Sequence, residues 1–303
     1  MSFPPELFLI GAQKSGTTYL AGMLGRQRGI TLAEPKEPHF FTREWRRGLN
    51  WYRACFPESA NGILLDASPS YSAAPVHLGP TSASNPETSA LAGVPQRIRE
   101  VAPAARFLYL MRHPVDRMWS SYWHDVRYRG LRRPFEDAIE VDPRYRNASN
   151  YLAQIELYQR CFPEDRFLFL LFEDLASRPQ SVLRECLDFL GMERNDASEG
   201  SASGRHGGYV PVGPARAAVH AVRRSPALNQ LQTLLWGKLP RSTQRWIKRS
   251  MTRPVPEMPA ATRRALEAEF STMVSPLERL TGRNLECWDL RSDPSPVHPA
   301  SGQ

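Results

Sequence analysis

The amino-acid sequence predicts an α/β fold in which a central parallel sheet is covered by helices on both faces. Three observations lead to this class: short apolar runs alternate with helix-forming segments, a glycine-containing turn joins the first run to the first helix, and the apolar runs end before residue 191. Short, continuously apolar strands that alternate with helices are typical of parallel sheets buried on both sides. With 303 residues, 41% of them hydrophobic, the chain is long enough to bury a substantial core.

Four apolar runs are the predicted strands, and five segments with helical character are the predicted helices. The strands are expected at 6–10, 62–66, 105–111 and 165–172. The helices are expected at 17–26, 94–102, 115–129, 151–161 and 178–191. Pro114 stands at the first turn of the third helix and Gly191 is the C-cap of the fifth, which are positions that these residues favour. The segment 77–93 is rich in Ser, Pro, Thr and Gly and is expected to be a long loop.

The C-terminal third differs from the rest of the chain, because no strand is predicted after Gly191. A loop is expected there, followed by helical segments, at 194–214, 215–239 and 259–281 respectively. The Pro- and Ser-rich tail, 292–303, is expected to be disordered. The predicted boundaries are 1–291 for a single domain, 6–191 for its α/β core and 192–291 for its helical C-terminal part.

Cysteine spacing and hydropathy exclude several classes of protein. The four cysteines lie far apart and form no CxxC pair, which argues against a zinc site and against a disulfide-rich scaffold. No apolar run approaches the roughly 18 residues of a membrane span. The first residues also lack the basic and apolar regions of a secretory signal, so we expect a cytoplasmic protein.

The net charge of +8 is concentrated in one part of the chain. Residues 1–200 hold 24 basic and 24 acidic residues, whereas residues 201–303 hold 15 and 7. The stretch 200–256 carries ten basic residues and no acidic one. Of the 39 basic residues 35 are arginines, whose planar guanidinium suits phosphate and sulfate oxygens. This composition indicates an anionic partner, and the alternative interpretation is a solvated surface.

The turn after the first predicted strand has the features of a phosphate-binding loop. Residues 9–18 read Leu-Ile-Gly-Ala-Gln-Lys-Ser-Gly-Thr-Thr, with the strand before them and the helix after them. Backbone N–H groups of such a loop, at the positive end of a helix, bind an anion. In the common nucleoside-triphosphatase pattern a lysine follows the second glycine. Here Thr17 has that place and the lysine is Lys14, which argues against ordinary ATP hydrolysis. No apolar run ends in an Asp that is convincingly placed to hold Mg²⁺, and Asp66 is the only candidate.

A second candidate anion site follows the predicted strand at 105–111. Arg112 stands where that strand ends, and open α/β sheets bind ligands at the carboxyl ends of their strands. Arg112 and Ser120 are therefore candidates to bind a second phosphate. Arg117, between them, is expected to be structural or to pair with Asp116 or a later acidic residue.

Together the two anion elements resemble those of the sulfotransferases that depend on PAPS (3′-phosphoadenosine 5′-phosphosulfate), in the branch of the heparan sulfate sulfotransferases and their bacterial homologues. The stretch 14–18 resembles the family's 5′-phosphosulfate loop, and 112–120 resembles its 3′-phosphate element. Further similar stretches are Lys-Glu-Pro-His-Phe-Phe at 36–41, residues 49–57, Asp-Ala-Ser-Pro-Ser-Tyr at 66–71, and Phe-Glu-Asp-Leu at 172–175. The resemblance implies a P-loop-like three-layer fold, PAPS as donor, PAP as product, and no metal ion.

The resemblance also implies roles for individual residues. Lys14 would contact the transferring sulfuryl group, the loop after it would bind the 5′-phosphate, and a late loop would close over the 3′-phosphate and adenine. The donor-binding residues implied in this way are Lys14, Ser15, Gly16, Thr17, Thr18, Arg112, Ser120, Ser203, Gly204 and Arg205.

The catalytic residues implied by the resemblance are Glu37, Lys14 and His39. Glu37 falls where the heparan-type enzymes have a glutamate base, and a hydroxyl acceptor needs a base to take its proton. His39 is the alternative base or a neighbour of Glu37. From the residues alone, Glu37 could instead form a surface ion pair with Lys36 or Arg43, and His39 could pack against Phe40. Ala67 stands where the glycan enzymes often have a lysine.

The predicted function is transfer of the sulfuryl group from PAPS to a hydroxyl, or with less support an amine, of a glycan, glycolipid or natural product. One alternative is a P-loop kinase or nucleotide hydrolase that needs ATP and Mg²⁺. The other is a non-enzymatic binder of an anionic surface that uses the arginines of 205–253. That stretch has few aromatic residues, so nucleic acid is not an expected partner. Its bases beyond Arg205 are expected to form a solvated helix face, with peripheral membrane contact as the alternative.

Overall fold

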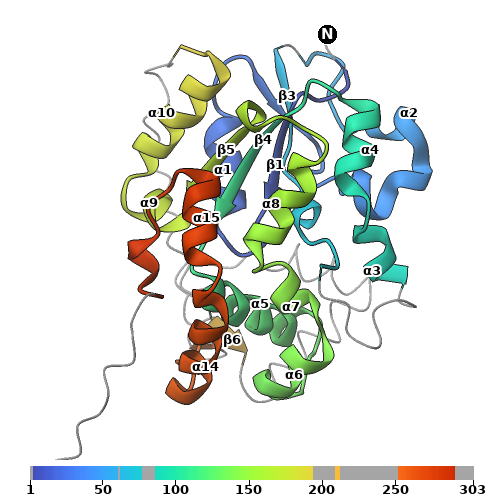
Figure 1. Ribbon diagram of the computed structural model, residues 1–303. Helices are drawn as coiled ribbons and strands as arrows, with labels where there is room; N and C mark the ends of the chain where they lie inside the picture. The colour runs from blue at the N-terminus through green and yellow to red at the C-terminus, as the bar shows by residue number, and fades with distance from the viewer. Residues whose placement is uncertain (1–2, 61, 77–85, 194–208, 212–251, 291–303) are drawn as a thin grey trace, which may run out of the picture.

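The computed structural model describes residues 3–60, 62–76, 86–193, 209–211 and 252–290, and Figure 1 shows how its layers are arranged. Five parallel strands form one sheet in the order β2-β3-β1-β4-β5. These strands are β1 (Leu7–Gly11), β2 (Ile30–Leu32), β3 (Ile63–Asp66), β4 (Arg106–Met111) and β5 (Phe167–Leu171). The predicted central parallel sheet is therefore confirmed.

The strand order places a switch point beside β1. The chain adds β2 and β3 on one side of β1, then crosses over and adds β4 and β5 on the other side. Open α/β sheets bind their ligands outside the carboxyl ends of the strands at such a point. The phosphate loop follows β1 and Arg112 follows β4, so the parallel pairing brings both to the same edge of the sheet.

The two faces of the sheet are packed with different kinds of side chain. Alternate strand residues point to opposite faces. One face is aliphatic and packs against α1 (Thr17–Leu24), α9 (Phe172–Ser177) and α10 (Pro179–Leu190). The opposite face carries aromatic rings and packs against α4 (Val94–Val101), α8 (Tyr151–Gln159) and α15 (Val274–Thr281). The strand residues on this second face include Phe8, Phe107, Tyr109, Phe167 and Phe169.

Further helices gather beyond the carboxyl ends of the strands (Figure 1). They are α5 (Pro114–Tyr128), α6 (Phe135–Val141), α7 (Arg144–Asn147) and α14 (Ala260–Ser271). The C-terminal helix α14 is tied to α5, because Arg263 Nη2 lies 2.6 Å from Asp116 Oδ1. Nearby, Trp119 Nε1 donates to the Pro256 carbonyl at 2.9 Å. The C-terminal segment thus packs against the helix that follows Arg112.

Several predictions about single elements were wrong. The edge strand β2 was not predicted, because it has only three residues and of these only Ile30 is buried. A short helix, α3 (Pro86–Leu91), lies inside the predicted loop 77–93. The strand predicted at 165–172 is shorter, since Phe172 begins α9.

A strand pair also lies beyond Gly191, where no strand was predicted. It consists of β6 (Tyr209–Pro211) and β7 (Thr252–Pro254), which pair antiparallel. Three residues are too few to show a periodicity, and the partners are far apart in sequence. Most of the predicted loop 194–214, the helical segment 215–239 and the tail 292–303 lie outside the described residues. No helix in the described part of the chain is long and apolar enough to cross a lipid bilayer.

Candidate active site

The loop between β1 and α1 has a geometry that suits an anion. Gly16 stands before α1 with φ of 90°, and this helix N-terminus has neither a side-chain cap nor an acidic residue in its first turn. Its N–H groups and the positive end of the helix dipole are thus available to an anion. Within the loop, the Ser15 hydroxyl is fully buried and has no hydrogen-bond partner among the described residues. A phosphate oxygen would satisfy that hydroxyl, so the loop fits the phosphate group expected there.

Positive charge surrounds this loop. Burial, together with the charges of Arg127 and Arg112, lowers the pKa of Lys14. Lys14 forms no ion pair with any carboxylate that the structure describes. Arg112 Nη1 donates to the Lys14 carbonyl at 3.1 Å, so the two predicted anion elements are in direct contact. A bound anion would offset the repulsion between these cations.

Arg112 is held in place from several sides. Its guanidinium carbon lies 4.6 Å from the centroid of the Phe172 ring, a cation–π contact. Tyr151 donates its hydroxyl to the Arg112 carbonyl at 2.7 Å. Glu173 Oε1 accepts from the next backbone N–H, that of His113, at 3.0 Å. These contacts fix both the side chain and the backbone at the end of β4.

The other predicted residues of the second anion element lie on α5. Ser120 is half-buried in the second turn of this helix. Arg117 is fully buried, donating to Ser149 Oγ and to the Tyr145 carbonyl, each at 2.5 Å. The structural role predicted for Arg117 is confirmed, and its alternative pairing with Asp116 is wrong because Asp116 pairs with Arg263.

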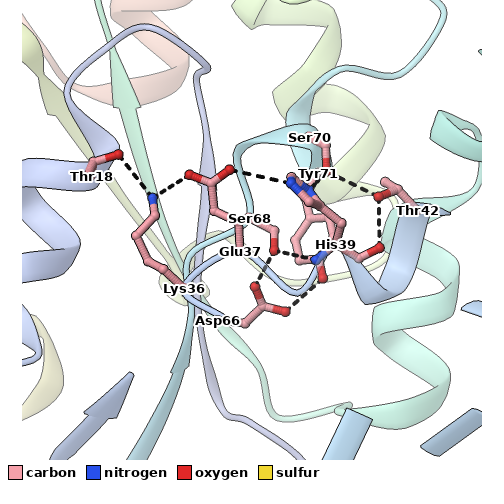
Figure 2. Close-up of polar contacts among 9 residues, drawn as sticks. All are labelled: Thr18, Lys36, Glu37, His39, Thr42, Asp66, Ser68, Ser70 and Tyr71. Carbon is pink, nitrogen blue, oxygen red and sulfur yellow. Dashed lines mark hydrogen bonds and ion pairs between the residues drawn. The ribbon is translucent and has the colours of Figure 1, made fainter. Parts of the chain in front are cut away.

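A second polar cluster lies beside the phosphate loop (Figure 2). We call it the Glu37 network and define it as the polar side chains drawn from the segments 36–42 and 66–71. Lys36 Nζ lies 2.5 Å from Glu37 Oε1 and donates to Thr18 Oγ1, in the phosphate loop, at 3.1 Å. On the other side, His39 Nε2 lies 3.4 Å from Glu37 Oε2. Glu37 therefore pairs with Lys36 but not with Arg43, and His39 is its neighbour.

The environment of Glu37 keeps its carboxylate ionised. Burial raises the pKa of Glu37, but hydrogen bonds from His39 and Lys36 and the charge of Lys36 outweigh it, and the pKa falls to about 2. At neutral pH the group is therefore an anion that can only accept hydrogen bonds. A hydroxyl brought to it would donate its proton toward this carboxylate.

His39 is fixed by strained backbone and by hydroxyl groups. Its φ is 52°, and Lys14, with φ of 72°, is another of the three described non-glycine residues with positive φ. Such strain is concentrated at functional sites. The His39 N–H donates to Ser68 Oγ at 3.0 Å, and its Nδ1 lies 2.8 Å from Ser70 Oγ. The Thr42 hydroxyl lies 3.2 Å from the Ser70 hydroxyl and is the last polar partner on the His39 side of the network.

Aromatic packing supports the same turn. A π-helix, η1 (Phe40–Glu44), begins directly after His39, and such turns are frequent at functional sites. The Phe40 ring is buried and stacks on the Tyr52 ring with centroids 4.2 Å apart. Phe41 is fully buried against Phe8 of the sheet. The two phenylalanines thus anchor the residues that precede them to the core.

Asp66 lies at the buried end of the Glu37 network. It is fully buried and accepts hydrogen bonds from the hydroxyls of Ser68 at 2.6 Å and of Tyr52 and Tyr71 at 2.7 Å each. Burial raises the pKa of Asp66, and these three hydrogen bonds oppose that effect. Both of its carboxylate oxygens are thus engaged by hydroxyl groups inside the protein. The described residues hold no group of three or more His, Cys, Asp or Glu side chains arranged for a metal ion.

Several residues of the site had no predicted role. Tyr52, Ser70 and Phe172 lie in stretches that resemble the family, yet nothing in the sequence showed that they contact Asp66, His39 and Arg112. Lys36 was considered only as a surface ion-pair partner. The late-loop residues Ser203, Gly204 and Arg205 lie outside the described residues, as do all bases of the 205–253 stretch except Arg253.

Comparison with known proteins gives one consistent family. A family model described as "Sulfotransferase family" matches residues 5–196. Human heparan sulfate glucosamine 3-O-sulfotransferase 6 is 26% identical over 291 residues, covering 92% of this chain and 72% of the relative. The mouse 3-O-sulfotransferase 3B1 is 29% identical over 205 residues, covering 63% of this chain and 47% of the relative.

A solved structure shares the fold. The crystal structure of a sulfotransferase from Alicyclobacillus acidocaldarius matches with a TM-score of 0.63 at 22% identity, covering 95% of this chain and all of the other. The family match decides against the kinase, the nucleotide hydrolase and the non-enzymatic binder. The chain belongs to the sulfotransferase family and is an enzyme that transfers a sulfuryl group from PAPS to a small-molecule or glycan acceptor, releasing PAP.

Proposed function

We propose that this enzyme sulfates a glycan hydroxyl, with Glu37 as the general base. One observation supports this assignment above the others. Lys36 contacts both Thr18 of the phosphate loop and Glu37, so the carboxylate lies one side chain away from the loop. An acceptor hydroxyl that contacts Glu37 would therefore stand close to a sulfuryl group held above the loop.

The proposed donor site uses the two anion elements in contact with each other. The N-terminus of α1, with Ser15, Gly16, Thr17 and Thr18, binds the 5′-phosphate. Lys14 binds the sulfuryl oxygens. Arg112 and Ser120 bind the 3′-phosphate, and Arg112 is supported by its contact with the Lys14 carbonyl and with the Phe172 ring. The late loop proposed to bind over the 3′-phosphate and adenine contains Ser203, Gly204 and Arg205.

In the proposed transfer step the acceptor oxygen attacks sulfur in line with the bridging oxygen of PAPS. A new S–O bond forms while the S–O bond to the 5′-phosphate breaks, and PAP leaves with that electron pair. Glu37 takes the proton of the acceptor hydroxyl. The ammonium of Lys14 and the loop N–H groups stabilise the charge that develops on the sulfuryl and phosphate oxygens.

His39 is proposed to orient Glu37. Its Nε2 faces Glu37 and its Nδ1 faces Ser70, so both ring nitrogens already have partners. A base must offer a free lone pair to the acceptor proton, and Glu37 has further acceptor capacity on its oxygens. This arrangement favours Glu37 over His39 as the base.

The acceptor class is proposed from the relatives. The human and mouse relatives are heparan sulfate glucosamine 3-O-sulfotransferases, whose names specify a glycan and transfer to oxygen. We therefore propose a sugar hydroxyl as the acceptor, with a natural-product hydroxyl as the second candidate. Ala67, which stands between Asp66 and Ser68, provides no cation for the acceptor at that position.

Binding of PAP is the first test. We expect PAP to raise the thermal unfolding temperature at micromolar concentration, whereas ATP with Mg²⁺ raises it much less. A PAPS analogue labelled in the sulfuryl group is then offered to heparan-type oligosaccharides and to phenols in parallel. Label transferred to an oligosaccharide hydroxyl supports the proposed acceptor class. No stabilisation by PAP, or transfer to phenols only, would contradict the proposal.

We also propose that residues 1–291 act as one domain and that the protein works in the cytoplasm. Ion pairs such as Arg263–Asp116 and Arg283–Glu185 join the described C-terminal segment to the α/β core. All four cysteines are free thiols, which suits a reducing compartment. Peripheral membrane contact through the 205–253 stretch remains an alternative to a solvated face.

A further inference from the structure

Lys36 is the one side chain that joins the phosphate loop to the Glu37 network in the described structure (Figure 2). It follows β2, at the edge of the sheet, whereas Thr18 belongs to the first turn of α1. Its ammonium lies 3.1 Å from Thr18 Oγ1 and 2.5 Å from Glu37 Oε1. The side chain is a quarter exposed, so a ligand at the loop can reach it.

An ammonium group has three N–H donors and a single positive charge. In the structure, the ammonium forms its closer contact with the Glu37 carboxylate, at 2.5 Å, and a longer hydrogen bond with the Thr18 hydroxyl, at 3.1 Å. A phosphosulfate anion bound at the loop would compete with Glu37 for the same ammonium. An ammonium drawn toward the anion moves away from Glu37, and its attraction for the carboxylate weakens as that distance grows.

This competition for the ammonium changes how strongly Glu37 can accept a proton. Burial raises the pKa of Glu37, and its hydrogen bonds with His39 and Lys36 and the charge of Lys36 lower it to about 2. A carboxylate of so low a pKa is a weak proton acceptor, and general bases work best with a pKa closer to the operating pH. Of the groups that lower this pKa, Lys36 is the one that also contacts the donor loop.

We propose that Lys36 couples donor binding to the base: its ammonium is shared between Glu37 and the donor, and the arrival of PAPS draws it from the carboxylate. Glu37 then becomes a stronger proton acceptor only when the phosphate end of the nucleotide occupies the loop, and PAP carries the same 5′-phosphate as PAPS. Lys36 is thus a positioning residue that acts through Glu37. This inference rests on the proposed function of Glu37 and of the phosphate loop.

A double-mutant cycle on PAP affinity tests the sharing without an acceptor. Isothermal titration calorimetry measures PAP binding to the wild type, Lys36→Met, Glu37→Gln and the double variant at neutral pH. We expect Lys36→Met to weaken PAP binding about threefold alone and about tenfold or more in the Glu37→Gln background, where the lysine is fully available to the donor. Lys36→Arg retains the cation and is expected to keep near wild-type affinity.

A matched control uses another adjacent cation and carboxylate. Arg166 Nε lies 3.9 Å from Asp165 Oδ1, just before β5 and thus at the opposite edge of the sheet from the site. Arg166→Met and Asp165→Asn are expected to leave PAP affinity unchanged, alone and together. Thermal unfolding checks that every variant is folded.

A spectroscopic readout follows Glu37 directly. The carboxyl carbon of Glu37 in ¹³C-labelled protein is assigned by the loss of its signal in Glu37→Gln. We expect this signal to shift when PAP is added to the wild type, and to shift little in Lys36→Met.

The outcomes distinguish a failure of the coupling from a failure of the proposed function. If PAP binds but Lys36→Met has the same effect in both backgrounds, or the Glu37 signal does not move, the coupling is wrong while the proposed function stands. If the wild type binds no PAP, the proposed donor site fails and the coupling fails with it. A larger loss in the Glu37→Gln background together with a Lys36-dependent shift supports the coupling.

Discussion

The phosphate loop and the Glu37 network lie side by side at one edge of the sheet, yet they are built in different ways. The loop is one continuous segment, 11–18, and its anion-binding groups are backbone N–H groups at the start of α1. The Glu37 network joins two segments, 36–42 and 66–71, through contacts between side chains. One region depends on backbone conformation and the other on a set of matched polar partners.

This difference determines what mutation does to each region. Backbone groups cannot be removed by substitution, so in the loop only Lys14 carries a charge that a variant can delete. In the network, the hydroxyls of Ser68, Ser70 and Thr42 support His39, and every substitution leaves a polar partner without its bond. The loop therefore depends on its two glycines and on Lys14, whereas the network depends on each of its polar partners.

The largest expected effect comes from the one charged side chain of the loop. Lys14→Ala removes the ammonium proposed to stabilise the transferring sulfuryl group, and we expect kcat to fall by about 10³-fold. Affinity for PAP, which lacks the sulfuryl group, is expected to fall less than about tenfold because the loop N–H groups remain. Rates with labelled PAPS and calorimetry with PAP measure the two effects. Equal losses in both would show that Lys14 serves binding rather than transfer.

The second largest effect comes from the network. Glu37→Gln keeps the shape of the side chain and removes its basicity, and we expect kcat to fall by about 10²- to 10³-fold. PAP should bind to this variant at least as tightly as to the wild type, since a carboxylate near the donor is lost. The same assays apply, with Glu34→Gln as the control for a nearby carboxylate. Unchanged transfer by Glu37→Gln would leave His39 as the base.

The same contrast explains how much of the site the sequence could predict. The loop was predicted from residues 9–18 alone, because a strand, two glycines, a lysine and a helix follow one another without interruption. The position of Arg112 followed from the end of an apolar run. In both cases the relevant neighbours are close in sequence, so a local pattern is sufficient.

The Glu37 network could not be predicted in this way. Glu37 and His39 were proposed only through the resemblance to a family, and their contacts with Lys36 and Ser70 depend on how β2 and β3 lie together. β2 itself was not predicted, because a three-residue edge strand has no pattern of its own. The π-helix that begins directly after His39 also has no sequence signal. Contacts between distant segments follow from the tertiary structure.

The network is expected to respond to pH in a way that the loop does not. The pKa of Glu37 lies at about 2 in the folded protein and near 4.5 ordinarily, so its ionised form stabilises the fold. This contribution is complete above about pH 4.5 and is lost as the pH falls toward about 2. Between about pH 6 and about pH 3 we expect the wild type to lose about 1 kcal/mol more unfolding free energy than Glu37→Gln, after discounting for solvent screening.

Urea unfolding of the two proteins at both pH values measures this difference. Glu34→Gln is again the control, since no ion pair of Glu34 is found in the described structure. Equal losses in the wild type and Glu37→Gln would mean that the ion pairs with Lys36 and His39 do not stabilise the fold.

The smallest expected effect concerns the support of the donor side. The Phe172 ring lies under the Arg112 guanidinium and against the position where a Cβ of Gly16 would be, so it contacts both anion elements. Phe172→Leu keeps the apolar volume and removes the aromatic face. A cation–π contact at a partly exposed site contributes about 0.5–1 kcal/mol, so PAP affinity should fall about two- to fivefold. Phe189→Leu, a partly buried phenylalanine of α10, is the matched control and should leave affinity unchanged. If Phe172→Leu binds PAP as the wild type does, Arg112 is positioned by its hydrogen bonds with the Tyr151 hydroxyl and the Lys14 carbonyl and by the bond of the next residue, His113, to Glu173. In that case the donor side would depend on backbone geometry throughout, and its difference from the Glu37 network would be sharper still.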